Sequence, residues 1–260
     1  MRETWSKPPD AVLILAVKDA MADLDAIQNE QFGADRTYTT GDRAMHIDYW
    51  GTRGATHKRQ AEVEFLTGTG DWKVTLRAAQ ADYEQGLQAG YSDHWILGQF
   101  VVLRSVLSSA ANVRLDRPDR RWEETCRAVR LGLDSGNSHE QMWAWSSLAD
   151  LRLVSMREGW PLESLPQQAT GKDLERMIHV VGGPDHCPAL WPTFRQFWRW
   201  RDWWKDDNWA AAAREGYDLL WTLVRPRLPV QLPTAPPPEE EPAARKSSDR
   251  RILLDESGDA

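Results

Sequence analysis

Two stretches of the sequence combine tryptophan with cationic side chains at helical spacing. The first contains four residues at intervals of 4, 3 and 4 positions: His46, Trp50, Arg53 and His57. This spacing puts all four on one face of a helix, with Lys58 and Arg59 beside it. Such a face suits an acidic peptide or a phosphate-bearing ligand. The alternative is that Trp50 packs inward while Arg53, Lys58 and Arg59 form a solvated rim.

The second stretch lies near the end of the aromatic part of the chain. It interleaves three arginines with four tryptophans: Arg195, Arg199 and Arg201 with Trp198, Trp200, Trp203 and Trp204. A helix of this composition must bury more than one side, against a further helix pair, a second copy or a partner. Arg195, Arg199 and Trp203 are therefore candidate partner-binding residues. Nucleic acid is a weaker candidate, because the chain carries a net charge of −7.

No catalytic or metal-binding constellation emerges from the remaining residues. His179, His186 and Cys187 are potential ligands, but two glycines separate them and no fourth ligand has suitable spacing. Adjacent side chains such as His186 and Cys187 rarely face each other as base and nucleophile. Gly68-Thr-Gly70 lacks the Lys-Ser/Thr of a phosphate loop. The sequence therefore predicts no enzyme, no metal and no cofactor.

The elements that must position these residues are all predicted to be helices. Apolar spacing and turn residues indicate helices at about 13–27, 43–66, 72–89, 93–110, 120–133, 140–156, 172–181, 192–204 and 209–224. Scattered carboxylates precede several of them and are expected to cap helix N-termini: Asp71, Asp93, Asp119, Asp206 and Asp207. No segment alternates with period two, so we predict an all-α fold over residues 1–225.

The composition changes sharply after residue 225. Residues 226–260 contain seven of the fifteen prolines, no aromatic residue and a Pro-Pro-Pro-Glu-Glu-Glu run at 236–241. Such a segment cannot bury enough apolar surface to offset the entropy of ordering it. We therefore predict a disordered Pro/Glu-rich tail, with the apolar triplet Ile252-Leu253-Leu254 as its one potential docking segment.

Two helix ends within the body are similar to each other. The segments 83–90 and 129–136 both place glycine at the same two positions, Gly86 and Gly90 in one and Gly132 and Gly136 in the other. We expect the first glycine of each pair to allow close approach of a helix and the second to end its own helix. These positions resemble the packing positions of tetratricopeptide repeats, which predicts an α-solenoid of antiparallel helix pairs. An irregular helical bundle is the alternative.

The order of short motifs along residues 12–222 adds a more specific resemblance. The motifs are Gly51-Thr-Arg-Gly54-Ala-Thr-His-Lys58-Arg59-Gln-Ala61, Ser92-Asp-His-Trp95, Trp143-Ala-Trp-Ser-Ser-Leu148 and Phe194-Arg195-Gln196-Phe197. Together they resemble the divergent tetratricopeptide-like modules, related to the TRAFs-binding region, of bacterial signalling and defence proteins. Those modules are often associated with caspase-like or CHAT peptidases. The resemblance implies a non-catalytic scaffold, sensor or adaptor with a protein partner, which could be such a peptidase.

Composition limits the remaining possibilities. Two cysteines, Cys126 and Cys187, exclude a disulfide scaffold, and the apolar run at 11–17 is far shorter than the roughly 20 residues that span a bilayer. We therefore expect a cytoplasmic protein with neither a membrane anchor nor a nucleic-acid partner, and leave its oligomeric state open. The alternative function is a small-molecule or nucleotide sensor that binds phosphate on the His46–His57 face.

Overall fold

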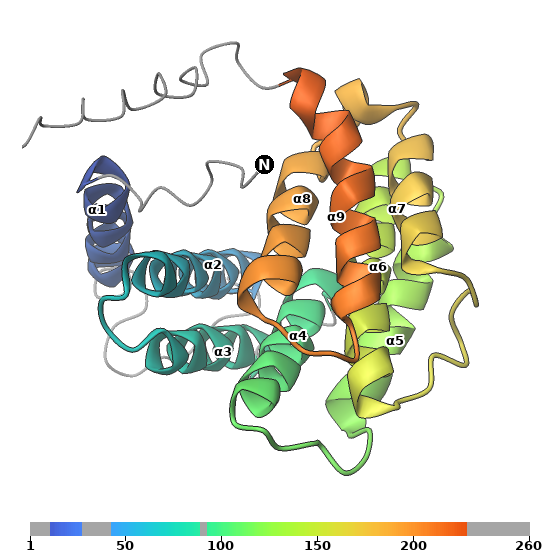
Figure 1. The fold of residues 1–260 in the computed structure, drawn as a ribbon. Coiled ribbons are helices and arrows are strands. Elements are labelled where there is room, and N and C mark those ends of the chain that lie inside the picture. Colours follow the sequence, from blue (N-terminus) through green and yellow to red (C-terminus); the bar gives the residue numbers. More distant parts are fainter. Residues whose placement is uncertain (1–10, 28–42, 89–92, 228–260) are drawn as a thin grey trace, which may run out of the picture. The chain divides into compact units, whose positions relative to one another are not determined.

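The computed structural model describes residues 11–27, 43–88 and 93–227, which form helices joined by loops (Figure 1). Their bounds are α1 Ala11–Ile27, α2 Arg43–Thr67, α3 Trp72–Gln88, α4 His94–Ala110, α5 Arg120–Leu133, α6 Ser138–Glu158, α7 Thr170–His179, α8 Leu190–Trp198 and α9 Ala210–Val224. Short turns of helix are η4 Pro184–His186, η5 Arg199–Trp203 and η6 Arg225–Arg227. The described ranges contain no strand, so the all-α prediction is confirmed.

The chain divides into a compact unit of residues 1–226 and a second unit of residues 227–260. All of the α-helices belong to the first unit. The predicted tail, including Ile252-Leu253-Leu254, lies outside the described residues except for its first two positions in η6.

Local capping explains where several helices begin. The carboxylate of Asp93 accepts hydrogen bonds from the backbone N–H groups of Trp95 and Ile96, and Asp119 accepts one from Trp122. The side chain of Asn137 does the same at the start of α6. Each cap satisfies backbone donors that have no partner inside the helix. The capping predictions for Asp93 and Asp119 are therefore confirmed.

Two other predictions about helix ends are wrong. Asp206 does not cap α9, which begins without a side-chain cap. Its Oδ2 accepts hydrogen bonds from Ser109 and Arg157, and its Oδ1 accepts them from the backbone and side-chain N–H groups of Asn208, in the turn before α9. The carboxylate therefore fixes the turn that precedes α9 and joins it to α4 and α6. Gly136 does not end α5, because the helix stops at Leu133 with Asp134 as its cap.

Each helix from α1 to α6 packs against the next one along the chain, and α8 packs against α9. The glycines predicted to allow close approach do so. A Cβ atom on Gly132 would lie 2.8 Å from that of Ala144 on α6, and one on Gly86 would lie 3.4 Å from that of Trp50 on α2. Further contacts join α4 to α6 and α7 to α9. The solenoid arrangement itself stays a prediction.

Tryptophan fills much of the space between these helices. Trp122, Trp200 and Trp209 are among the largest fully buried side chains, and the three rings pack with other aromatic groups. None of the helices in the described ranges has the length and apolar character needed to cross a bilayer.

Candidate functional site

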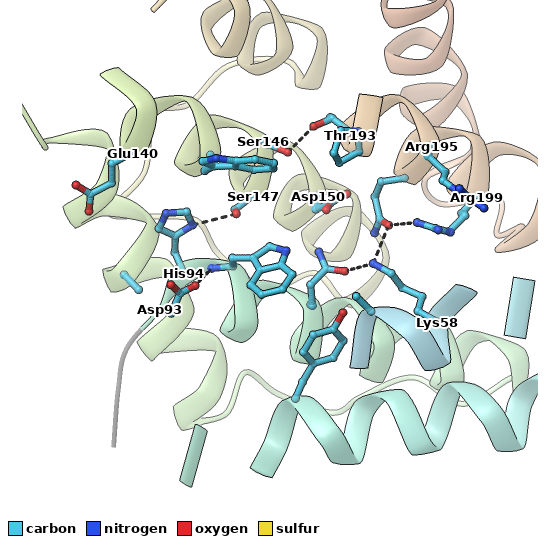
Figure 2. Close-up of a pocket in the computed structure, with 18 of the residues that line it drawn as sticks. Lys58, Asp93, His94, Glu140, Ser146, Ser147, Asp150, Thr193, Arg195 and Arg199 are labelled. Carbon is cyan, nitrogen blue, oxygen red and sulfur yellow. Dashed lines mark hydrogen bonds between the residues drawn. The ribbon is translucent and has the colours of Figure 1, made fainter. Parts of the chain in front are cut away.

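A cavity of about 940 Å³ lies among helices α2 to α6, α8 and η5. Its volume falls at the upper end of the range typical of small-molecule sites, roughly 300 to 1,000 Å³. Figure 2 shows labelled polar and charged residues at both ends of this space. The two ends differ in chemistry, and we describe them in turn.

The first end is cationic and is built by two segments that are far apart in the sequence, α2 and the continuous stretch of α8 and η5. Helix α2 contributes Lys58 and Arg59, while α8 and η5 contribute Arg195 and Arg199. Arg195 and Arg199 are four residues apart and therefore lie on the same face. The chain passes from α8 into a π-helical turn at Arg199, where the N–H of Trp204 bonds to the carbonyl of Arg199. Turns of this kind occur frequently at functional sites.

The carboxylate of Glu62 on α2 accepts hydrogen bonds from both Arg195 of α8 and Arg199 of η5. Arg195 donates to it from Nε at 3.1 Å and from Nη2 at 2.7 Å, and Arg199 donates from Nε at 3.0 Å and from Nη2 at 2.7 Å. Burial alone raises the pKa of the Glu62 carboxyl, but Arg199 and Arg195 outweigh burial and hold that pKa at about 2. Glu62 therefore stays ionised and balances only part of the positive charge.

Lys58 is buried within this polar end. Its Nζ donates to the side-chain oxygen of Gln99 and, at 3.4 Å, to that of Gln196, which also accepts from Arg199 Nη1 at 3.1 Å. Burial, and then the charge of Arg199, lower the pKa of Lys58 well below its usual value. Nearby Asp150 is buried and accepts from Trp200 Nε1 at 2.7 Å, and burial raises its pKa to about 6.

Arg59 differs from the other cations of the cavity. It is exposed, and it makes no hydrogen bond or ion pair with any other described residue. Partial burial, together with the charges of Arg195 and Arg199, lowers its pKa to about 10. The positive charges at this end are thus close enough to disfavour one another, because the neighbouring carboxylate is already engaged.

The second end carries neutral polar groups together with the carboxylates of Asp93 and Glu140. His94 Nδ1 lies 3.2 Å from Ser147 Oγ, and burial lowers the pKa of His94 and favours its neutral form. At the rim, Trp143 Nε1 donates to His139 Nε2 at 3.1 Å. Figure 2 shows His94, Ser147 and Glu140 at this end, away from Lys58 and Arg199.

Aromatic rings line the cavity between the ends. Trp95 and Tyr83 pack edge to face with ring centroids 6.1 Å apart. The hydroxyl of Tyr83 is buried and has no hydrogen-bond partner among the described residues. A buried polar group without a partner is unfavourable.

The structure brings together half of the residues predicted to bind a partner. Lys58, Arg59, Arg195 and Arg199 line the cavity, whereas Trp50, Arg53, His57 and Trp203 do not. Lys58, expected to be exposed if this stretch formed a solvated rim, is instead buried.

The other predicted residues take part in packing between helices. Trp50 is buried with its ring edge-on to Tyr49, and His57 Nδ1 lies 2.5 Å from a carboxylate oxygen of Asp82 on α3. Arg53 forms ion pairs with Asp25 on α1 and with Asp82. The predicted helical face thus exists, and it is turned toward α1 and α3. Trp203 stacks on Phe65 of α2, with ring centroids 5.3 Å apart.

Several cavity residues belong to motifs of the sequence but were not predicted to bind a ligand. His94, Ser147 and Tyr83 are single residues on three different helices, and only tertiary packing joins them. Asp150 offered a faint signal, because it interrupts an apolar run from Leu148 to Leu151. A carboxylate at the centre of an apolar helix face requires a buried partner or a functional role.

Comparison of this chain with protein-family models, with curated proteins and with solved structures gave no match. The tetratricopeptide-like assignment therefore stays a prediction from the motifs of the sequence. Within residues 11–27, 43–88 and 93–227, no group of three or more His, Cys, Asp or Glu side chains is arranged to hold a metal ion.

Proposed function

We propose that this chain is a non-catalytic binding protein for an anionic small molecule, held at the cationic end of the cavity. The observation that carries the proposal is the arrangement of Lys58, Arg59, Arg195 and Arg199 around a space large enough for a ligand. The carboxylates of Glu62 and Asp150 neutralise only part of their charge. An anion near Arg59 would supply the missing counter-charge and accept its hydrogen bonds.

The pKa shifts at this end support the same conclusion. The pKa values of Lys58 and Arg59 are both lowered, by burial and by neighbouring cations. The part of this lowering that comes from neighbouring cations reflects a positive field, and a positive field also favours a bound anion. Binding an anion would therefore relieve repulsion that the free protein bears.

The cavity favours binding of a small molecule over docking of a protein partner. The large apolar side chains that remain exposed come from separate helices, among them Val74 of α3, Leu131 of α5, Met156 of α6 and Trp191 of α8. Isolated exposed apolar side chains are ordinary on protein surfaces. A role as scaffold or adaptor in a bacterial signalling or defence pathway, with a caspase-like or CHAT peptidase as partner, is supported by the sequence resemblance alone. Affinity purification of the tagged chain from its native cells tests that part.

Calorimetric titration of the full chain with inorganic pyrophosphate tests the proposal. We expect measurable binding that weakens as salt is raised. Arg59→Gln should weaken binding by about tenfold, since a hydrogen bond to a charged group contributes roughly 1.5 kcal/mol or more. Arg77→Gln, at another exposed arginine but on α3 and outside the cavity, is the matched control. Absence of binding, or equal binding by parent and Arg59→Gln, would contradict the proposal.

A further inference from the structure

The two ends of the cavity suit different parts of a ligand, and a simple anion would interact with the cationic end alone. Lys58, Arg195 and Arg199 lie at one end, and His94 and Ser147 lie at the other (Figure 2). Phosphate or sulfate bound beside Arg59 would leave the second end to water. A volume of about 940 Å³ accommodates a ligand that reaches both ends.

The lining between the ends suits a planar ring. Trp95 and Trp143 both line the cavity, and both are partly exposed rather than fully packed in the core. Indole faces bind the flat faces of nucleobases by stacking, with little dependence on which base is present. Aliphatic or highly branched ligands would gain less from these walls.

The polar groups near the rings suit the edge of a base or a sugar hydroxyl. A neutral imidazole carries one donor and one acceptor nitrogen, and a serine hydroxyl both donates and accepts. His94 and Ser147 meet these conditions. The carboxylates of Asp93 and Glu140 lie at the same end and can accept hydrogen bonds from a base or a sugar, whereas the opposite end carries cations.

We propose that the ligand of this cavity is a nucleotide, with its phosphates beside Arg59 and Arg195 and its base between the tryptophans and the His94–Ser147 pair. This inference rests on the proposed function, since it places the anionic part of the ligand at the same cationic end. It adds a ring-binding half that the proposed function does not require.

Calorimetry with ADP, GDP, CDP and UDP, each compared with pyrophosphate, tests the inference on the full chain. We expect at least one nucleotide to bind about tenfold or more tightly than pyrophosphate, because stacking adds affinity. Trp143→Ala should reduce nucleotide affinity toward that of pyrophosphate and leave pyrophosphate binding unchanged. Trp191→Ala is the matched control, since Trp191 is exposed and does not line the cavity.

A smaller substitution tests the same inference if Trp143→Ala does not fold. Ser147→Ala removes one hydroxyl at the second end and should weaken nucleotide binding without affecting pyrophosphate. If pyrophosphate binds and no nucleotide binds more tightly, or if both variants bind nucleotide like the parent, the inference is wrong while the proposed function stands. If neither pyrophosphate nor any nucleotide binds, both are wrong.

Discussion

Glu62 on α2 and Arg199 in η5 are 137 positions apart in the chain, yet Glu62 Oε2 accepts hydrogen bonds from Arg199 Nε at 3.0 Å and Nη2 at 2.7 Å. Both side chains are nearly inaccessible to solvent, at 7% and 4% exposure. Arg195 binds the same carboxylate. This arrangement joins an early helix to a late one and forms the wall of the cavity where its cations gather.

Glu62→Gln should destabilise the protein strongly. The substitution keeps the shape of the side chain but leaves two guanidinium groups without their counter-charge, and breaking a buried ion pair costs about 3–5 kcal/mol. Urea unfolding at neutral pH measures the change. Glu175→Gln, in the exposed Lys172–Glu175 pair, is the control and should change the free energy of unfolding little.

The difference between the parent and Glu62→Gln should also depend on pH. The Glu62 carboxyl has a pKa of about 2 in the folded protein and an ordinary value of 4.5. Its contribution to stability is therefore present above pH 4.5 and is lost as the pH falls through about 2. A difference that stays constant across this range would show that the carboxylate charge does not stabilise the fold.

Asp150→Asn should alter the pH dependence of stability in the direction opposite to Glu62→Gln, because the pKa of Asp150 is raised rather than lowered. Burial raises the folded pKa of Asp150 from 3.8 to about 6, so its protonation favours the folded state below pH 3.8, and that contribution is lost as the pH rises through 6. Asparagine can still accept the hydrogen bond from Trp200. Relative to the parent, the variant should gain about 1 kcal/mol in unfolding free energy between pH 5 and pH 8. Parallel profiles for the two proteins would contradict this account.

Gly216→Ala should loosen the contact between α8 and α9. A Cβ atom at this position would overlap the ring of Phe197 and lie 3.1 Å from Leu174 Cδ1. Overpacking of this kind costs roughly 1–3 kcal/mol. Gly98→Ala is the matched helical control, since its Cβ would meet only Ser147 at 3.9 Å, and the gain in helix propensity should make it neutral or slightly stabilising. In thermal unfolding, Gly216→Ala should lower the melting temperature, whereas Gly98→Ala should leave it unchanged or raise it slightly.

Trp203→Ala should reduce stability, although the sequence marks Trp203 as a candidate for binding a partner. Its ring is 5% exposed and packs against Phe65 and Trp72 of the N-terminal helices. Removing a buried tryptophan costs about 3–5 kcal/mol. Trp191→Ala removes a tryptophan that is 42% exposed and should cost much less. Equal losses in urea unfolding would show that Trp203 does not contribute to the core as its position indicates.

The sequence alone determined the helices, because their signals are local. The interval 120–133 was predicted from apolar spacing and a preceding aspartate, and α5 has those bounds with Asp119 as its cap. Capping and amphipathic periodicity involve residues within one or two turns of each other, so they can be interpreted without knowing the fold. Gly132 also predicted the close approach of a neighbouring helix, because glycine destabilises a helix interior and is usually kept there for packing.

Tertiary structure decided which of the charged residues share a site. His57 and Lys58 are neighbours in the sequence, yet His57 turns toward Asp82 on α3 while Lys58 turns into the cavity. The partners of Lys58 and Glu62 come from positions up to 138 residues away, and no local pattern encodes such a distance. A helix presents charge on several faces, and only the packing of its neighbours determines which face encloses a ligand, which face joins another helix and which meets water.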